Sequence, residues 1–178
     1  MKNVIKIFNE LSEIEYGSLN IQTLKPLGND SDASHMLVCK PDELLKYKQG
    51  TCWDQSLYIY DRLKSSYTVC VIACWISLSE MNCTGHTAVA VKLDKWFWVE
   101  TAWNAHKGIH AFNSSEDILN EIKKFQPQSK ASVYLNNVNT AYDALLNYHG
   151  KISGKDFIST VFGKVPILKN GNIEYFNP

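Results

Sequence analysis

Apolar residues recur at helical spacing in the first third of the chain. Near the N-terminus an apolar residue stands at every third position, which predicts a helix over residues 3–16 that ends at Gly17. Residues 41–48 predict a short helix that opens with a proline in its first turn and stops at Gly50. Residues 51–64 (TCWDQSLYIYDRLK) predict a longer helix, because one broad apolar stripe follows a threonine that is an acceptable N-cap residue.

Three strand-like segments come next. Residues 69–76 (VCVIACWI) are apolar at successive positions, as expected of a strand that is buried on both faces. Residues 86–93 and 96–103 are rich in Val, Thr and Trp. Only Asp94 and Lys95 separate these two segments, so we predict an antiparallel hairpin.

Helical patterns return toward the C-terminus. The predicted helices cover residues 116–125 after a cap at Ser114 or Ser115, residues 141–149 between a cap at Asn139 or Thr140 and Gly150, and residues 155–162 between Ser153 and Gly163. A turn is expected over 28–32, and no repeat or linker divides the chain, which predicts one domain over 1–178. Helix, strand cluster and helices in this order indicate an α+β fold.

The composition is that of an ordinary globular chain. Its 178 residues include 18 Lys and Arg against 18 Asp and Glu, so the formal net charge is zero, and 45% of the residues are hydrophobic. This balance argues against a disordered chain and against a nucleic-acid-binding protein, which needs a basic surface. No apolar run approaches the roughly 18 residues of a membrane span, and polar residues interrupt the N-terminal apolar stretch, unlike a signal peptide. We therefore expect a cytoplasmic protein without a membrane partner, whose five cysteines, an odd number, are reduced.

Three ionisable residues stand at the ends of the predicted elements, in positions that suit thiol catalysis. Cys52 opens a helix, His86 opens a strand, and Glu100 lies near the far end of the adjoining strand. The first turn of a helix favours a thiolate and offers backbone amides to an oxyanion. An imidazole can take the thiol proton and later give it to a leaving group, and a carboxylate can orient that imidazole.

The register of the hairpin decides whether His86 and Glu100 can meet. A three-residue connection over 93–95 would place Lys92 opposite Trp96. His86 and Glu100 would then be diagonal neighbours on one face, about 7–8 Å apart at the backbone and closer at their tips. A two-residue turn would put them on opposite faces. We predict the three-residue connection.

Three segments resemble the core of the transglutaminase-like superfamily. They are GTCWD at 50–54, GHTAVAV at 85–91 and WFWVETAW at 96–103. This group of cysteine enzymes includes transglutaminases, peptide N-glycanases, arylamine acetyltransferases and bacterial peptidases. The resemblance covers roughly residues 41–111. It implies a papain-like fold, in which a catalytic helix packs on an antiparallel sheet.

The resemblance also implies the role of each residue in the triad. Cys52 stands at the position of the nucleophile, His86 at that of the general base and acid, and Glu100 where the family usually has aspartate. The extra methylene of glutamate changes the reach of the carboxylate. Papain-type enzymes place an oxyanion glutamine several residues before the cysteine, and here Gln49 is near that position but not at it.

The remaining contacts of the cleft are expected near the triad. The Cys52 amide is one oxyanion donor, and the second is Trp53 or Gln49. Gln55 and Trp103 are further candidates for the cleft. Asp54 is expected to be a negative charge at the helix N-terminus rather than a catalytic acid.

The expected reaction is hydrolysis of a peptide, isopeptide or other amide bond in a protein or peptide substrate, without a cofactor or metal. Transfer to an amine, as in crosslinking, is one alternative, and a catalytically inactive binding module on the same fold is another. A zinc-stabilised interaction domain is the third, with Cys70, Cys74, Cys83 and His86 as ligands. His106 and His110 are expected on a loop surface or beside the cleft, and the oligomeric state stays open.

Overall fold

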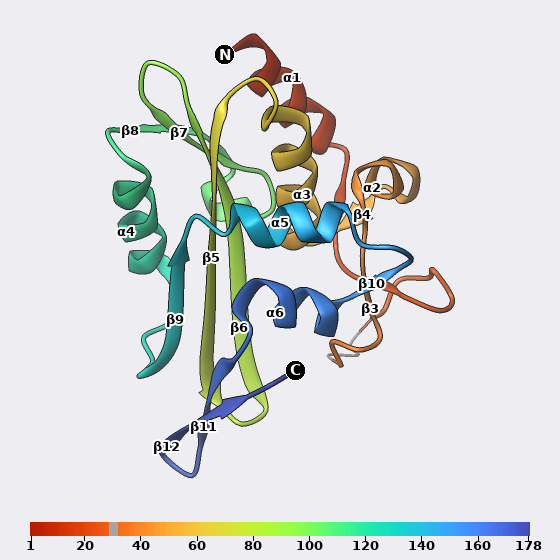
Figure 1. Ribbon diagram of the computed structural model, residues 1–178, viewed down its shortest axis with the longest axis vertical. Helices are drawn as coiled ribbons and strands as arrows, with labels where there is room; N and C mark the ends of the chain where they lie inside the picture. Colours follow the sequence, from red (N-terminus) through yellow and green to blue (C-terminus); the bar gives the residue numbers. More distant parts are fainter. Residues whose placement is uncertain (29–31) are drawn as a thin grey trace.

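The computed structural model describes residues 1–28 and 32–178 (Figure 1). The helices are α1 (Lys2–Leu11), α2 (Pro41–Tyr47), α3 (Cys52–Leu63), α4 (Ser115–Phe125), α5 (Asn139–Leu146) and α6 (Gly154–Phe162), with a 3-10 turn η1 (Asn104–His106). The strands are β1 (Glu15–Tyr16), β2 (Leu19–Asn20), β3 (Met36–Val38), β4 (Gln49–Gly50), β5 (Thr68–Ser79), β6 (Asn82–Lys92), β7 (Trp96–Glu100), β8 (Gly108–Phe112), β9 (Ala131–Asn136), β10 (Ile152–Ser153), β11 (Val165–Lys169) and β12 (Asn172–Phe176). The predicted turn over 28–32 lies largely outside the described residues. None of the helices in the described part of the chain has the length and apolar content that crossing a membrane requires.

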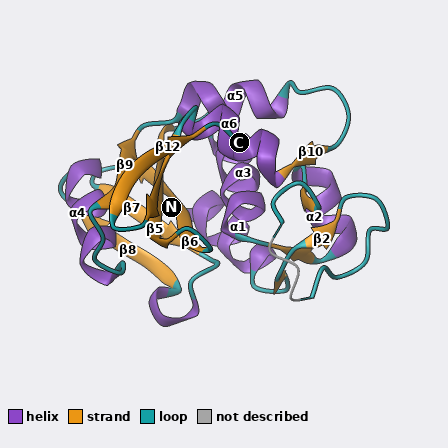
Figure 2. Cartoon of the chain, turned by 90° about the horizontal axis from the view of Figure 1, so that it is seen from below, coloured by secondary structure: helices purple, strands orange, loops and turns teal. Residues whose placement is uncertain are grey.

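An antiparallel sheet in the order β8-β7-β6-β5-β9 lies at the centre of the molecule. Its two longest strands, β5 and β6, form a hairpin that continues well past the ends of β7 and β8 (Figure 1). Helix α4 lies on one side of the sheet, and α1, α3, α5 and α6 lie on the other (Figure 2). The protein therefore has an α+β fold.

The alternation of side chains along β5 divides the core into two clusters. Val71 packs with Leu57 of α3 in the first cluster, and its neighbour Ile72 packs with Ile118 of α4 in the second. All four side chains are at most 1% exposed. A strand buried on both faces needs apolar residues at successive positions, which explains the unbroken apolar run in the sequence.

The start of α3 and the turn of the β6–β7 hairpin follow the sequence predictions, whereas β6 begins at Asn82, so His86 lies within the strand and does not open it. Helix α3 begins at Cys52, and the hydroxyl of its N-cap residue Thr51 accepts the N–H of Trp53 at 3.2 Å. Strands β6 and β7 are joined by the three-residue connection, with Lys92 opposite Trp96. Both predictions are confirmed.

The capping predictions for α4 and α6 are confirmed as well. The Ser114 hydroxyl accepts the N–H of Asp117, and the Ser153 hydroxyl accepts the N–H of Asp156, each at 3.0 Å. In α6 the Asp156 carboxylate in turn accepts the Ser153 N–H, which completes a capping box.

The prediction for α5 is wrong at both ends. Its N-cap residue is Val138 rather than Asn139 or Thr140, and the helix ends at Leu146. The Asn139 side chain is used elsewhere. Its Oδ1 accepts the Val71 N–H at 2.9 Å, and its Nδ2 donates to the Val69 carbonyl at 2.7 Å. Asn139 therefore joins α5 to the edge of the sheet instead of capping the helix.

Helix α1 is shorter than predicted. It ends at Leu11 rather than Tyr16, because Glu15 and Tyr16 form β1 and pair in parallel with β4. Its buried face includes Val4, whereas Ile5 of the predicted stripe is 44% exposed.

The C-terminal region contains strands that the sequence pattern did not predict. Strands β8 and β9 extend the central sheet at its two edges, and β11 pairs with β12 in a separate hairpin. Every residue of β12 is exposed, so this strand has no buried face that would give a period of two in the sequence.

Candidate active site

The N-terminus of α3 presents Cys52 as its first helical residue. The Asp54 carboxylate accepts the backbone N–H and the hydroxyl of Thr51, each at 2.6 Å, in a reciprocal capping box. The N–H of Cys52 is a first-turn amide without an acceptor among the described residues. Gly50 permits a close approach to α2, since a Cβ there would lie 2.5 Å from Leu44.

Asp54 is a buried structural anchor of this turn. It is 1% exposed and also accepts the N–H of Cys39, so it joins the segment before α2 to the start of α3. Burial raises the pKa of Asp54 to about 6, although hydrogen bonds from Thr51 and Cys39 oppose the shift. In residues 1–28 and 32–178 no lysine, arginine or histidine forms an ion pair with it.

Both carboxylate oxygens of Glu100 are hydrogen-bonded. Oε2 lies 2.8 Å from Nε2 of His86 and accepts the indole N–H of Trp98 at 3.1 Å. Oε1 accepts the backbone N–H groups of Ala102 and Trp103 at 2.9 and 2.7 Å. These last two bonds turn the chain after Glu100, which is why β7 ends there and not at Trp103 as predicted.

The Cys52 thiol lies near the His86 imidazole, close enough for a thiolate there to raise the pKa of the ring. Because Nε2 is bound to Glu100, Nδ1 is the ring nitrogen that remains for the sulfur. Burial disfavours a charge on this ring, but the Cys52 thiolate and the Glu100 carboxylate outweigh burial and raise the pKa of His86 to about 10. The ring of His86 is therefore stabilised in its charged form.

A network of hydroxyl groups holds the carbonyl of Cys52 from the other face of β6. Thr87 and Ser56 donate to this carbonyl at 2.8 and 2.6 Å. The Ser56 oxygen also lies 2.8 Å from the hydroxyls of Thr87 and of Tyr142 in α5. Since Thr87 follows His86 directly, the network fixes Cys52 relative to the strand that bears the imidazole.

The end of β7 leaves one edge of β6 without a neighbour. In the described part of the chain, the backbone of residues 82–87 pairs with β5 but with no strand on its other side, because β7 stops at Glu100. A cavity of about 310 Å³ opens along this edge and is lined by Thr84, Gly85 and His86.

Aromatic side chains form a wall of this cavity. Trp103 packs edge-on against His86 with ring centroids 5.1 Å apart, and Phe125 at the end of α4 also lines the space. His106 lies against both rings, 4.4 Å from Trp103 and 3.9 Å from Phe125. His106 therefore supports the wall from behind, and the exposed His110 stands outside it.

Tyr16 is a site residue that the sequence did not indicate. The residue is 59% exposed, but it also lines the cavity and lies near Cys52. The charge of the thiolate and the burial of the hydroxyl raise the pKa of Tyr16 far above its ordinary value, so the phenol stays a neutral donor. Parallel pairing of β1 with β4 places Tyr16 beside Gly50. Pairing between two-residue strands has no signature in the sequence.

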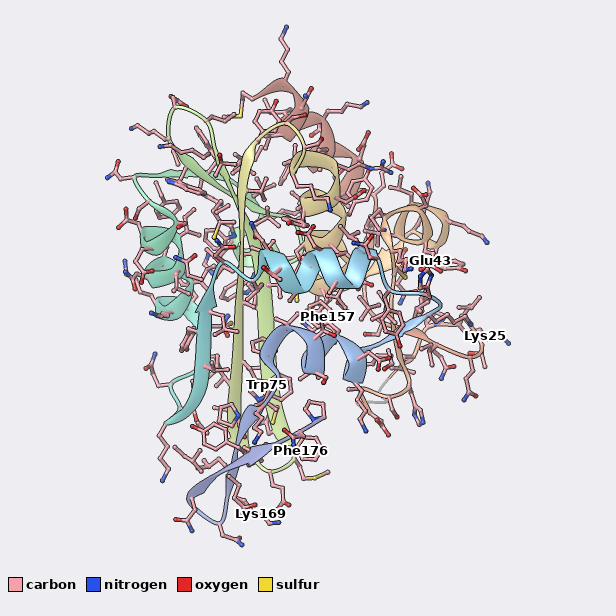
Figure 3. The ribbon with its side chains drawn as sticks, in the orientation of Figure 1. Lys25, Glu43, Trp75, Phe157, Lys169 and Phe176 are labelled. Atoms are coloured by element: carbon pink, nitrogen blue, oxygen red, sulfur yellow. The ribbon has the colours of Figure 1, made fainter. Side chains whose placement is uncertain are left out.

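Two of the predicted cleft residues point elsewhere. The Trp53 ring stacks on Phe157 of α6, labelled in Figure 3, with centroids 4.7 Å apart. The Gln49 amide donates to the Ser18 carbonyl at 3.4 Å. Of the cleft candidates outside the triad, Trp103 is the one that lines the cavity.

Gln55 is buried one turn after Cys52, at 2% exposure. Its amide nitrogen donates to the Gly50 carbonyl at 3.3 Å, which also accepts the N–H of Gly17. Its Oε1 has no hydrogen-bond partner among the described residues. Gln55 thus supports the turn into α3 and does not line the cavity.

The cysteines proposed for zinc are not brought together. Cys74 faces His86 across the β5–β6 pair, while Cys70 lies 3.0 Å from an asparagine oxygen of β9 and Cys83 lies near the end of the hairpin. No three His, Cys, Asp or Glu side chains within 1–28 and 32–178 form a group that could hold a metal ion. Burial raises the pKa of Cys74 to about 12 and also raises the pKa of Cys39 and Cys70, so these thiols stay protonated.

No family model matches this chain, and neither a curated protein nor a solved structure matches it. What the site can do therefore follows from its own geometry. It combines a thiol at a helix N-terminus, an imidazole near that thiol, and a carboxylate that holds the imidazole. These are the parts of a nucleophile with its base and orienting group.

Proposed function

We propose that the protein is a transglutaminase-like cysteine enzyme that hydrolyses a peptide, isopeptide or other amide bond through a thioester at Cys52. The placement of Cys52 near His86, which Glu100 in turn holds at 2.8 Å, is the observation that supports this proposal. A thiol-bearing helix against an antiparallel sheet with the imidazole and carboxylate also agrees with the papain-like arrangement that the sequence resembles. The His86 and Glu100 side chains are at most 9% exposed, which strengthens their interaction.

The first half of the reaction forms the acyl-enzyme. The Cys52 thiolate attacks the carbonyl carbon of the amide, and the carbonyl oxygen takes up the negative charge. When the C–N bond breaks, the His86 imidazolium gives its proton to the leaving amine, and a thioester remains. Glu100 keeps the imidazole oriented and stabilises its charged form throughout.

Two donors are available for the oxyanion. The N–H of Cys52 lies in the first turn of α3 and has no acceptor among the described residues. The Tyr16 hydroxyl is a neutral donor beside the sulfur and takes the place proposed from the sequence for Gln49 or Trp53.

The second half of the reaction releases the acyl group. Neutral His86 takes a proton from water, the resulting hydroxide attacks the thioester, and the C–S bond breaks to give a carboxylic acid and the thiolate. Phe125 in the cavity wall is 41% exposed, so water reaches this side, which favours hydrolysis over transfer to an amine. An amine that replaced this water would give the crosslinking reaction from the same thioester.

Alkylation of each cysteine by iodoacetamide, measured by mass spectrometry against pH, tests the proposal. We expect Cys52 to react faster than Cys83 below about pH 7, because only the thiolate is nucleophilic. Cys83 is the internal reference, since it is the most exposed of the five cysteines. The advantage of Cys52 should disappear in His86→Ala.

His149→Ala is the matched control, since it removes an exposed histidine that does not line the cavity. It should leave the alkylation of Cys52 unchanged. If Cys52 reacts as slowly as the buried Cys39 at every pH below 8, the protein is an inactive binding module or a structural domain instead.

A further inference from the structure

The free edge of β6 offers backbone groups to a ligand. Strand β6 pairs with β7 only from Val89 onward, so residues 82–87 are bonded to β5 alone in the described part of the chain. Every second residue of an antiparallel strand directs its N–H and C=O to one side. Figure 1 shows this part of β6 continuing below the short β7. A polypeptide in extended form has the row of donors and acceptors that matches such an edge.

The edge and the candidate active site are continuous. The cavity of about 310 Å³ is lined by Thr84, Gly85 and His86 of this same segment. Thr84 and His86 project to the same face, toward the wall formed by Trp103. A peptide paired along the edge therefore passes the imidazole and can place one side chain in the cavity.

The cavity is uncharged apart from His86. Among the described residues that line it, none is aspartate, glutamate, lysine or arginine, and three are the aromatic side chains Tyr16, Trp103 and Phe125. The imidazole is already held by Glu100 at 2.8 Å. A charged side chain would lose its water here without gaining an ion pair, whereas an apolar one would replace water on aromatic surface.

We propose that the protein binds an extended polypeptide segment along residues 82–87 of β6, with a large neutral side chain of that segment in the cavity beside Trp103. The proposal names the substrate class for the function proposed above and rests on it. The volume is at the lower end for ligand pockets, so it accommodates one large side chain rather than a folded surface.

Binding to the full chain with Cys52→Ala tests this inference without chemistry. The probes are fluorescein-labelled, amide-capped hexapeptides of Ala and Ser that differ at one central residue, which is Phe, Lys or Asp. Fluorescence anisotropy should give a dissociation constant for the Phe peptide at least tenfold lower than for the other two. N-methylation of single amides should weaken binding at alternate positions only, because one side of a strand faces the edge.

A charge introduced at Thr84 sharpens the test. Thr84→Glu should favour the Lys peptide over the Asp peptide, and Thr84→Lys should reverse this order. Tyr175→Ala is the control, because it removes an exposed aromatic residue of β12 that does not line the cavity, and it should leave all three affinities unchanged.

The outcomes separate this inference from the proposed function. If the three peptides bind equally, or if none binds while Cys52 is alkylated selectively below pH 7, the substrate class is wrong and the thiol chemistry stands. Selective binding of the Phe peptide with an unreactive Cys52 would support the peptide groove and overturn the reaction proposed for it.

Discussion

The two faces of β6 approach Cys52 in different ways. On the face toward α4, His86 lies near the sulfur and is held by Glu100 at 2.8 Å. On the face toward α3, Thr87 and Ser56 hold the carbonyl of the same residue through neutral hydroxyls at 2.8 and 2.6 Å. The adjacent residues His86 and Thr87 of β6 thus act on the side chain and on the backbone carbonyl of Cys52, respectively.

This difference shows how β6 separates the His86 imidazole, which titrates, from the Thr87 and Ser56 hydroxyls, which do not. Hydroxyls keep the same charge over the working range of pH, so the bonds of Thr87 and Ser56 fix the position of the helix N-terminus. The imidazole changes its charge during the proposed reaction and needs a partner that stabilises the charged form. The buried carboxylate of Asp54 also supports this turn and is bound by neutral donors alone among the described residues, but burial raises its pKa to about 6, so it titrates as well.

Removal of the charged partner should give the largest effect. Glu100→Gln removes the charge that stabilises the imidazolium, and we expect amide cleavage to fall on the order of 10²–10⁴-fold. The pKa of His86, now about 10, should fall, because part of its rise comes from Glu100. Imidazolium is the acid in the first step, so the alkaline limb of the pH profile of cleavage should move to lower pH.

Two further variants sharpen this prediction. Glu100→Asp shortens the side chain, so it can reach either His86 or the two backbone N–H groups but not both, and its activity should lie between the others. Glu174→Gln on the exposed β12 should behave as the wild type. An unchanged alkaline limb in Glu100→Gln would contradict the role of the carboxylate.

The buried carboxylate of Asp54 should affect stability and its pH dependence. Burial raises the pKa of Asp54 from 3.8 to about 6 in the folded state, so between these values the folded protein binds more protons than the unfolded chain. Stability from this group is therefore present at low pH and lost as pH rises toward 6. Relative to Asp54→Asn, the wild type should gain about 2–3 kcal/mol of unfolding free energy between pH 7.5 and pH 4.

Urea unfolding of both proteins at several pH values measures this difference. Asp42→Asn is the control, since the Asp42 side chain is 95% exposed, and its difference from the wild type should show no such rise at low pH. A difference between wild type and Asp54→Asn that does not change with pH would show that the burial of Asp54 has no electrostatic cost.

The hydroxyl network should give the smallest effect. Thr87→Val keeps the shape of the side chain but removes its bonds to Cys52 and Ser56, which should reduce cleavage about tenfold and stability by about 1–2 kcal/mol. Thr87→Ser restores the hydroxyl and should recover most of the rate.

The pH profile distinguishes positioning from chemistry. In Thr87→Val the alkaline limb of the pH profile of cleavage, which reports the pKa of His86, should keep its position, while the maximal rate of cleavage falls. A shifted limb would mean that the two faces of β6 are not independent.

The sequence was most informative where one local rule determines the structure. The start of α3 follows from a capping threonine ahead of an apolar stripe, and the register that brings His86 to Glu100 follows from strand alternation and a three-residue connection. The donors that hold Glu100 were not predicted, because backbone N–H groups look alike in every sequence. The catalytic roles and the family resemblance stay predictions.

Contacts between distant segments explain what the sequence did not show. Tyr16 reaches the site through the two-residue parallel pairing of β1 with β4. The apolar stripe at the N-terminus instead predicted that Tyr16 is the last residue of a helix. Ser56, Thr87 and Tyr142 resemble ordinary surface hydroxyls until the fold buries all three together. Asn139 has the residue type of a helix cap but binds β5 instead.

The hydroxyl of Tyr142 has a consequence for protein synthesis. Its partner Ser56 precedes it by 86 residues, so a ribosome releases Cys52 long before it releases Tyr142. A nascent chain that already exposes Cys52 still lacks α5, and with it one hydroxyl of the network that fixes the thiol-bearing turn. The hydroxyl network around the Cys52 carbonyl is therefore completed only after α5 has been synthesised.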